Sequence, residues 1–344
     1  MHEEPDALEA GDIPEEALRG SHVSVLLVEV VEWLVPRLGG RYVDATLGNG
    51  GHARALLAAS GPDGRVLGLD ADPVALAVAS EHLGDLGGRA TLVHANFRDL
   101  GAVAAEHGFE RVDGIVMDLG LSSRQLETSG RGFSFREDEP LDMRFNPARG
   151  ASAADLLNEL DEGDIADLIY RYGEEPGSRR VARQVVRRRE REPLRTTGDL
   201  VAAIHAALGP RRGRTHPATR TFQALRIAAN DELGALEAAL PQAGALLRPG
   251  GRLAVIAFHS LEDRRVKQFF RAGGAADAPL RPLTKRPIVP SEPEVSGNPR
   301  ARSAKLRVAE RADDAERVGP DGASSGSLPR PHRPRSIAEE ATRE

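Results

Sequence analysis

Apolar and polar positions alternate in blocks between residues 42 and 119, and these blocks predict strands and helices in turn. Four short apolar runs predict strands over residues 42–43, 65–69, 90–95 and 112–118, and the segments between them have helical periodicity. Strands that alternate with helices in this way pair in parallel and form a doubly wound sheet. The fold class that we expect is therefore α/β.

This alternation stops after Leu121, and the following part of the chain has only helical patterns. Residues 132–215 contain no convincing strand, but they hold four amphipathic runs, at 154–157, 165–169, 181–186 and 200–204. Ser152 and Thr197 stand where helix N-caps are expected. We therefore expect residues 132–215 to form an all-helical domain inserted between the fourth and fifth strands.

The sheet is expected to resume after this insertion. A helix over residues 219–247 is predicted to end at Pro249-Gly250-Gly251 and to be followed by a strand over residues 253–258. Residues 304–309 predict a last strand, paired with that one in a hairpin with a long loop. The Pro-rich residues 280–299 are expected to be extended, and residues 23–38 have a helical pattern.

Two segments thus make up one discontinuous α/β domain, residues 22–131 and 216–311. Residues 1–21 are expected to be an acidic disordered tail. Residues 312–344 are dominated by Ser, Gly, Pro and charged residues, which also predicts disorder.

Composition excludes several classes of protein. The 344 residues contain no cysteine, so disulfides and thiolate metal sites are excluded, and no metal site is predicted. No apolar run is long enough to cross a membrane, and the acidic N-terminus is unlike a signal peptide. We therefore expect a soluble, cytoplasmic protein.

The charge is unevenly distributed along the chain. Residues 1–20 carry seven acidic residues and one arginine, which accounts for the whole net charge of −6. Residues 171–195 hold nine arginines and four glutamates, a pattern that a solvated helix face explains equally well. Residues 211–226 hold five arginines and no acid, which favours contact with nucleic acid.

The turn after the first strand carries the clearest chemical signal. Glycines at 48, 50 and 51 stand between the strand and a helical run over residues 53–59. Such glycines let the backbone approach a ligand, and the start of the helix offers free N–H groups. Asp70 follows Gly50 by twenty residues at the end of the second strand, where a carboxylate can accept both ribose hydroxyls of a nucleoside.

This turn alone leaves the cofactor open. Gly48, Gly50 and Ala53 also satisfy the dinucleotide fingerprint of a nicotinamide oxidoreductase, and a glycine turn that binds nothing is a further alternative. A positively charged sulfonium cofactor suits a site edged by Asp44, Asp70 and Asp118 better than an anionic pyrophosphate does.

Five longer blocks are more specific than the fold. They are DLGLSSRQL at 118–126, RGFSF through PLDMR at 131–144, HPATRTFQALRI at 216–227, FHSLEDR at 258–264 and NPRARSAKLR at 298–307. Together with residues 22–27 they resemble the ribosomal RNA small subunit methyltransferase H family, over about residues 22–311. The two tails fall outside the resemblance.

The resemblance implies a Rossmann-like, class I S-adenosylmethionine-dependent methyltransferase whose helical insertion recognises the substrate. It implies methylation at N4 of a cytidine in the decoding region of 16S rRNA of the small ribosomal subunit. Matching the family's motifs places S-adenosylmethionine against seven residues: Gly50, Gly51, His52, Asp70, Phe97, Asp118 and Gln125.

Three further residues are candidates for the chemistry on the target base. Asp118 follows a central strand and can accept a hydrogen bond from the target amine, which is a poor nucleophile. His259 and Ser260 follow another strand, and we expect them to face the same cleft and to contact the base or take its proton. A structural histidine at 259 is nearly as well supported. Asn230-Asp231-Glu232 is a weaker candidate for the pocket wall.

Arg212, Arg214 and Arg220 are expected to grip RNA phosphates. Two alternatives keep the cofactor fold: an assembly factor without catalysis, and a methyltransferase with another nucleic-acid or protein acceptor. The sequence leaves the oligomeric state open and is compatible with a homodimer.

Overall fold

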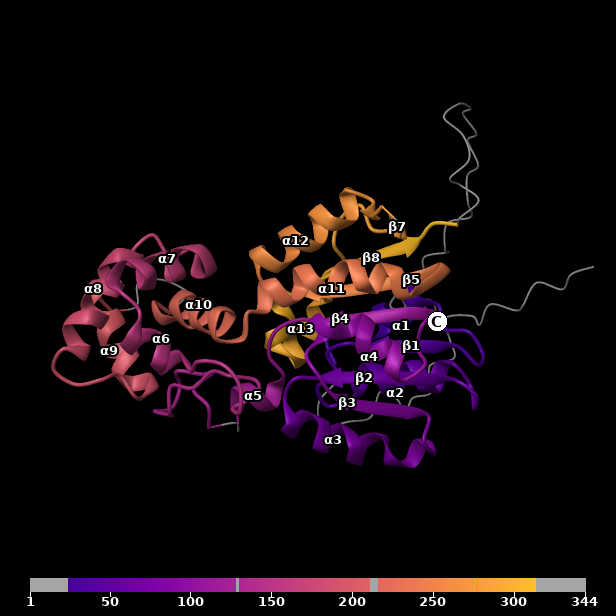
Figure 1. Cartoon of the computed structure of the whole chain (residues 1–344), viewed down its shortest axis with the longest axis horizontal. Coiled ribbons are helices and arrows are strands. Elements are labelled where there is room, and N and C mark those ends of the chain that lie inside the picture. The colour runs from indigo at the N-terminus through magenta and orange to yellow at the C-terminus, as the bar shows by residue number, and fades with distance from the viewer. Residues whose placement is uncertain (1–23, 128–129, 211–215, 277, 314–344) are drawn as a thin grey trace, which may run out of the picture. The chain divides into compact units, whose positions relative to one another are not determined.

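An eight-stranded sheet forms the centre of the α/β part of the chain (Figure 1). The computed structural model describes residues 24–127, 130–210, 216–276 and 278–313. The strand order is β3-β2-β1-β4-β5-β8-β7-β6. The first five strands along the chain pair in parallel, whereas β8 runs antiparallel to β5 and β7 antiparallel to β8. The strands are β1 (Arg41–Asp44), β2 (Arg65–Asp70), β3 (Ala90–His94), β4 (Val112–Asp118), β5 (Leu247–Ala257), β6 (Gly274–Ala275), β7 (Ala278–Pro282) and β8 (Lys305–Arg311).

Helices cover both faces of this sheet, because alternate strand residues point to opposite sides. Ile115 and Met117 of β4 pack in a core with α4 (Leu100–Glu106), α11 (Glu232–Leu246) and α12 (Ser260–Arg271). Val116, between them, packs on the other face, in a core with three helices: α1 (Leu27–Leu34), α2 (Gly51–Ala59) and α3 (Pro73–Leu83). The predicted Rossmann-like sheet and the antiparallel pairing of the last strand are confirmed.

The four amphipathic runs after β4 are helices, as predicted. They are α6 (Ala153–Glu159), α7 (Glu162–Gly173), α8 (Ser178–Arg189) and α9 (Thr197–Leu208). Between residues 132 and 210 the structure contains no strand, only a single bridge between Pro140 and Thr196. These helices share a hydrophobic core of their own, to which α10 (Ala218–Asn230) contributes Phe222 and Leu225.

The single helix predicted over residues 219–247 is wrong. The chain forms α10 and α11 instead, separated at Asp231, which adopts the left-handed conformation with φ of 47°. That conformation is uncommon for a residue with a Cβ. The side chain of Asp231 forms an ion pair with Arg98. The break sets the direction in which α11 leaves the helical core.

Helix ends differ from the predictions in two further places. Ser152 caps α6 as predicted, but the cap of α9 is Thr196 rather than Thr197. Thr197 instead donates its hydroxyl to the carbonyl of Glu137, at 2.8 Å. The helical pattern over residues 23–38 yields a shorter helix, α1, because Leu26 and Val35 at its ends both have positive φ.

Two segments rich in proline and glycine differ from the predictions. Pro249-Gly250-Gly251 lies inside β5, where the pairing with β4 shifts register, and α11 has already ended at Leu246. The segment expected to be extended contains α13 (Glu292–Gly297), which Ser291 caps and which carries a proline in its first turn, where proline is tolerated. None of the helices in the described residues is long and apolar enough to cross a membrane.

Candidate active site

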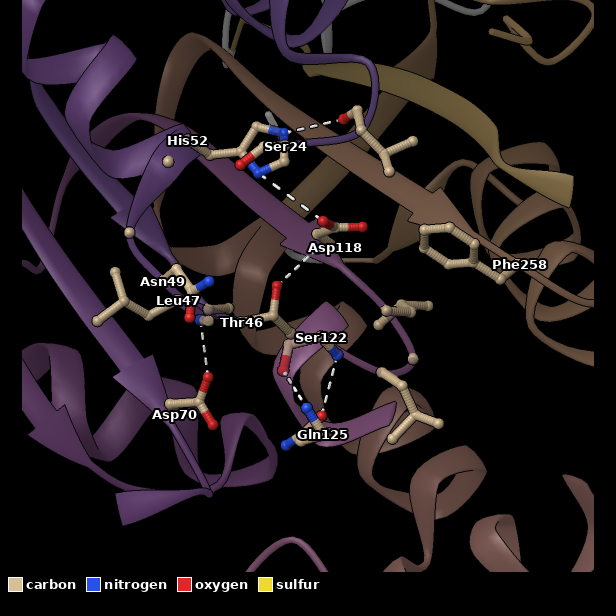
Figure 2. A pocket seen from close by; sticks show the side chains of 18 of the residues that line it. Ser24, Thr46, Leu47, Asn49, His52, Asp70, Asp118, Ser122, Gln125 and Phe258 are labelled. Carbon is tan, nitrogen blue, oxygen red and sulfur yellow. Dashed lines mark hydrogen bonds and ion pairs between the residues drawn. The ribbon is translucent and has the colours of Figure 1, made fainter. Parts of the chain in front are cut away.

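A cavity of about 390 Å³ opens where the carboxyl ends of β1, β2, β4 and β5 meet (Figure 2). The strand order reverses between β1 and β4, and ligands of open α/β sheets bind at such a point. All seven residues expected to bind the cofactor line this cavity: Gly50, Gly51, His52, Asp70, Phe97, Asp118 and Gln125. The fold therefore brings together residues that are up to 75 positions apart in the sequence.

The turn from β1 into α2 forms one wall of the cavity. Gly48 and Gly50 have φ of 52° and 82°, in the left-handed region that favours glycine. Gly50 is the N-cap of α2, and its N–H donates to the carbonyl of Leu47. With no side chain at these positions, the backbone itself forms the surface that a ligand would contact.

Asp70 ties this turn to the end of β2. Its Oδ2 accepts the N–H of Gly48 at 2.8 Å, and its Oδ1 accepts the N–H of Asp72 at 2.8 Å. Each carboxylate oxygen has a second lone pair and can accept a further hydroxyl. Burial raises the pKa of Asp70 to about 6, so the carboxylate form carries a desolvation cost that a ligand donor would offset.

His52 is buried at the start of α2 and faces Asp118. Its Nε2 lies 3.1 Å from the carbonyl oxygen of Val25, so this nitrogen must carry the proton. Its Nδ1 is then an acceptor, 3.9 Å from Oδ2 of Asp118. Burial lowers the pKa of His52 to about 4, which keeps the ring neutral.

Buried acceptor oxygens around the cavity lack donors. In the described part of the chain, Oδ2 of Asp44, Oδ1 of Asn49 and Oδ1 of Asp118 have no hydrogen-bond partner. Burial raises the pKa of Asp118 well above its ordinary value, and the charges of Asp44 and Glu262 raise it further. Burial likewise raises the pKa of Asp44 to about 7. A ligand that brings positive charge and hydrogen-bond donors would match this surface.

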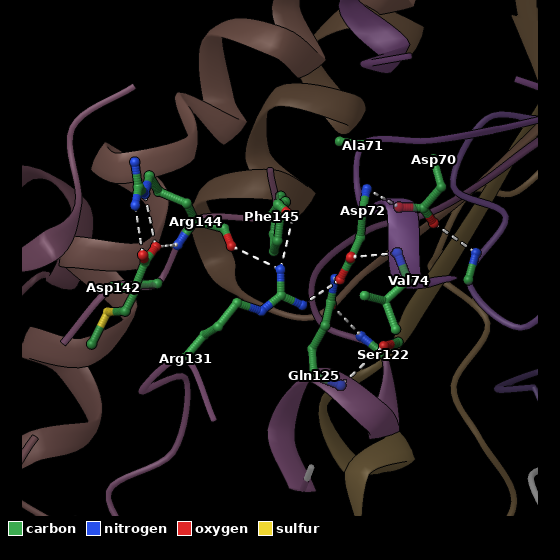
Figure 3. Close-up of polar contacts among 12 residues, drawn as sticks. Asp70, Ala71, Asp72, Val74, Ser122, Gln125, Arg131, Asp142, Arg144 and Phe145 are labelled. Carbon is green, nitrogen blue, oxygen red and sulfur yellow. Dashed lines mark hydrogen bonds and ion pairs between the residues drawn. The ribbon is translucent and has the colours of Figure 1, made fainter. Parts of the chain in front are cut away.

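Gln125 and Phe97 complete the wall around Asp70. Phe97 begins a single turn of 3₁₀ helix (Phe97–Asp99) and is half-buried at the cavity. Gln125, in the short helix α5 (Ser123–Glu127), accepts the N–H of Ser122 and donates its Nε2 to Oδ2 of Asp72 at 3.0 Å (Figure 3). Gln125 therefore fixes the loop after Asp118 to the end of β2.

Arg131 fastens the next loop to the same aspartate (Figure 3). Its Nη2 pairs with Oδ2 of Asp72, which is 2% exposed and also caps α3. Its Nη1 donates to the carbonyl of Phe145 at 2.8 Å. Because Phe145 lines the cavity, Arg131 connects the wall of the cavity with the loop that leads into α6.

The side chains of His259 and Ser260 form hydrogen bonds outside the cavity. His259 caps α12, where its Nδ1 accepts the N–H of Glu262 at 3.3 Å. Ser260 donates its hydroxyl to Glu174 at 2.7 Å, and neither His259 nor Ser260 is among the residues that line the cavity. From this turn, Phe258 and Glu262 line the cavity, and Oε2 of Glu262 accepts the N–H groups of Phe258 and His259.

Glu262, Glu232 and Arg226 form a buried ionic group at the cavity. Arg226 binds Glu232 through two hydrogen bonds, of 2.8 and 2.9 Å. Burial raises the pKa of Glu232. Burial would also raise the pKa of Glu262, but His259 and Arg226 hold it below its ordinary value. Of the weaker candidates at 230–232, Glu232 lines the cavity, whereas Asn230 and Asp231 are not among its lining residues.

Glu232, His259 and Glu262 are residue types that can hold a metal ion. The hydrogen bonds oppose this use of His259, because Nδ1 accepts a backbone N–H and Nε2 must then carry the proton. Nε2 lies 3.2 Å from Oε1 of Glu262. With the lone pair of Nδ1 used and a proton on Nε2, the ring has no free lone pair for a cation.

Of the three arginines expected to bind RNA, the structure describes one. Arg220 lies on α10, half its side chain is exposed, and its Nη1 is 3.7 Å from Glu175. Arg212 and Arg214 lie outside the described residues.

Sequence reasoning missed Glu262, Asp72, Arg131 and Phe145. Glu262 could have been found, because a glutamate three residues after an N-cap is a capping box. The pair of Asp72 and Arg131 gave no local signal, since the two residues are 59 positions apart.

Comparison with known proteins shows the family of the chain. A family model described as the MraW methylase family matches residues 19–312. A protein of Thermomicrobium roseum named "Ribosomal RNA small subunit methyltransferase H" is 52% identical over 86% of this chain and 95% of its own length. A protein of Heliobacterium modesticaldum with the same name is 52% identical over 84% and 98% of the two chains. The chain belongs to the MraW methylase family.

Proposed function

We propose that this protein transfers a methyl group from S-adenosylmethionine to 16S rRNA in the small ribosomal subunit, at N4 of a cytidine in the decoding region. The family and the relatives' name supply the substrate class. The single structural observation that supports the proposal is the cavity at the switch point, whose lining residues Asn49 and Asp118 carry unpartnered acceptors. The reaction takes place in the cytoplasm, where small subunits are assembled.

The residues present fit S-adenosylmethionine. Its ribose hydroxyls can donate to Asp70, and its adenine can pack on Phe97. Its ammonium and sulfonium charges can be balanced by Asp118, which lines the cavity, and by the charge of the buried Asp44 close to it. When bound, the cofactor supplies an electrophilic methyl group. The neutral ring of His52 adds an acceptor, Nδ1, beside Asp118.

Asp118 is the residue to which we assign direct contact with the target amine. The lone pair of a cytosine amine is delocalised into the ring, so the amine is a weak nucleophile. A carboxylate that accepts its N–H helps to localise this lone pair and orients it towards the methyl group. His259 and Ser260 can touch the base only if their hydrogen bonds to Glu262 and Glu174 break. We assign them the positioning of α12 and of Glu262.

Methylation of small subunits tests the function. Subunits from a strain that lacks the gene are incubated with the protein and labelled S-adenosylmethionine, and the digested RNA is analysed by mass spectrometry. We expect N4-methylated cytidine at one site of the decoding region. Cofactor binding without label in the RNA would favour another acceptor or an assembly factor. A melting temperature that responds to NADH rather than to S-adenosylhomocysteine would contradict the cofactor.

Affinity for S-adenosylmethionine should rise with pH. Burial raises the pKa of Asp44 to about 7 and of Asp70 to about 6, so both carboxyls lose their charge as the pH falls through these values. If binding requires one ionised carboxylate, affinity falls about tenfold per pH unit below its pKa. Calorimetric titrations between about pH 5 and 8, a range that brackets both values, measure the slope.

Adenosine is the control ligand for this titration, since it lacks the charged methionine part. Its affinity should therefore depend far less on the charge of Asp44. Asp44→Asn should flatten the dependence above about pH 6. Equal affinity for S-adenosylmethionine throughout the range would show that binding does not require the ionised forms of Asp44 and Asp70.

Loss of the arginines at 212, 214 and 220 should weaken RNA binding and flatten its salt dependence. Each phosphate contact to single-stranded RNA contributes about 0.7 to the slope of log affinity against log salt concentration. The triple alanine variant is compared with Arg65→Ala, which removes an exposed arginine at the first residue of β2. An unchanged affinity and slope in the triple variant would remove these arginines from the RNA interface.

A further inference from the structure

A second cavity, of about 260 Å³, lies between α12 and the antiparallel edge of the sheet. Helix α12 contacts both β7 and β8, and Figure 1 shows it beside these strands. Four basic side chains line the cavity: Lys267 and Arg271 from α12, Lys285 after β7, and Arg307 from β8. This cavity is separate from the cofactor cavity, with which it shares no lining residue.

Buried side chains form the floor of this cavity. Arg307 is 7% exposed, and its Nε donates to Oδ1 of Asp263 at 2.7 Å. Thr284 is 8% exposed, and its Oγ1 accepts the N–H of Val308, so its hydroxyl hydrogen can be donated to a ligand. The ring of Phe270 is buried beside them. Guanidinium and hydroxyl donors therefore have fixed positions.

Positive charge exceeds negative charge here. Asp263 is the acidic partner, shared by Arg307 and by Lys305, whose Nζ is 3.7 Å away. Within the described residues, Lys267, Arg271 and Lys285 form no ion pair. Three like charges that converge without a counter-charge repel one another, and an anion between them would relieve that repulsion.

The distribution of lysine points to the same place. The chain has only three lysines among its 46 basic residues, at positions 267, 285 and 305. Two line the cavity, and the third pairs with Asp263. A lysine ammonium is a compact charge on a flexible stem and binds phosphate oxygens from any direction, whereas arginine presents a planar fork.

We propose that this second cavity binds a phosphate group, and that the phosphate belongs to the backbone of the RNA substrate. A phosphate offers several oxygen acceptors in a tetrahedral array, which suits donors that approach from α12, from β8 and from the loop after β7. The RNA source rests on the proposed function; the phosphate chemistry does not.

The position of α12 favours the RNA backbone as the source. Glu262, in the first turn of α12, lines the cofactor cavity. Lys267 and Arg271 follow at about 8 and 14 Å along the axis, at 1.5 Å per residue. One helix thus extends from the wall of the cofactor cavity to the second cavity, and a strand whose base occupies the first can pass the second.

Titration with inorganic phosphate tests the chemistry without RNA. The full chain should bind phosphate in a chloride buffer, detected by calorimetry and by a rise in melting temperature. The double variant Lys267→Gln/Lys285→Gln should bind it about tenfold more weakly, or more, since two charge-assisted contacts are lost. The matched variant Lys267→Arg/Lys285→Arg keeps the charge and should retain most of the affinity. Equal affinity in the Gln variant would overturn the proposal.

RNA binding identifies the source of the phosphate. The Gln variant should bind small subunits, or a decoding-region RNA, about tenfold more weakly, with a salt slope reduced by about 0.7 per lost contact. Its affinity for S-adenosylmethionine should equal that of the wild type, and Arg65→Gln should match the wild type throughout. Weaker phosphate binding with unchanged RNA binding would assign a free phosphate compound instead and overturn the RNA source.

The phosphate titration and the RNA-binding experiment distinguish failure of this proposal from failure of the proposed function. If the wild-type protein does not methylate rRNA, the proposed function fails, while the titration with inorganic phosphate still decides whether the cavity takes phosphate.

Discussion

Asp118→Asn is expected to lower the rate of methyl transfer by about a hundredfold or more, in the range that removal of an acid–base group costs. The amide keeps the size of the side chain but loses the ionised acceptor that the target amine requires. Thermal stability should be unchanged or higher, because burial and the neighbouring Asp44 and Glu262 disfavour a carboxylate at this position. An amide can also donate to Nδ1 of His52.

Single-turnover methylation at saturating cofactor measures this effect, and calorimetry measures stability and cofactor affinity in the same samples. Asp63→Asn is the matched control, since it makes the same change at an exposed carboxylate that does not line the cavity. A variant at position 118 with a normal single-turnover rate would exclude Asp118 from the chemistry.

Arg131→Ala is expected to lower the free energy of unfolding by about 3 kcal/mol, because it leaves the buried carboxylate of Asp72 without its cation. Asp72 retains hydrogen bonds from Val74 and Gln125, which places the loss at the low end of the usual range. The melting temperature should fall by roughly 5–10 °C. The KM for the cofactor should also rise, since the carbonyl of Phe145 loses its donor.

A double-mutant cycle with Asp72→Asn separates the charge from the packing. The double variant Arg131→Ala/Asp72→Asn should be more stable than Arg131→Ala alone, because no uncompensated buried charge remains. Arg131→Lys should recover part of the stability but not the KM, as one ammonium cannot reach Asp72 and the Phe145 carbonyl with a fork geometry. Strict additivity of the two single substitutions would refute the coupling.

Local patterns predicted the parts of the fold that local forces determine. The strands of the sheet follow from apolar runs of strand length, and the four helices after β4 follow from amphipathic spacing. The glycine turn was predictable because Gly48 and Gly50 supply positive φ next to a helix start. The same conformation at Asp231, Leu26 and Val35 was not, because residues with a Cβ adopt it rarely and no glycine marks these helix ends.

The site was predictable where a residue contacts the ligand and much less so where it holds another residue. Asp70 and Asp118 end strands, and strand ends of a parallel sheet converge on one edge. Sequence position could not distinguish whether His259, at a similar strand end, faces the cavity or caps the next helix. Its hydrogen bond to the N–H of Glu262 makes it the cap.

The pairing of β4 with β5 has a consequence for how the chain folds during synthesis. About 130 residues separate the two strands, so the ribosome releases β4 many seconds before its neighbour, at about 5–20 residues per second. During that interval β4 has an unpaired edge, a hazard for aggregation. The intervening helices have mostly local contacts, which form quickly, so these helices can fold before β5 is available to pair with β4. The cofactor cavity, whose lining includes Phe258, Glu262 and Arg300, can then form only after the helical insertion has been synthesised.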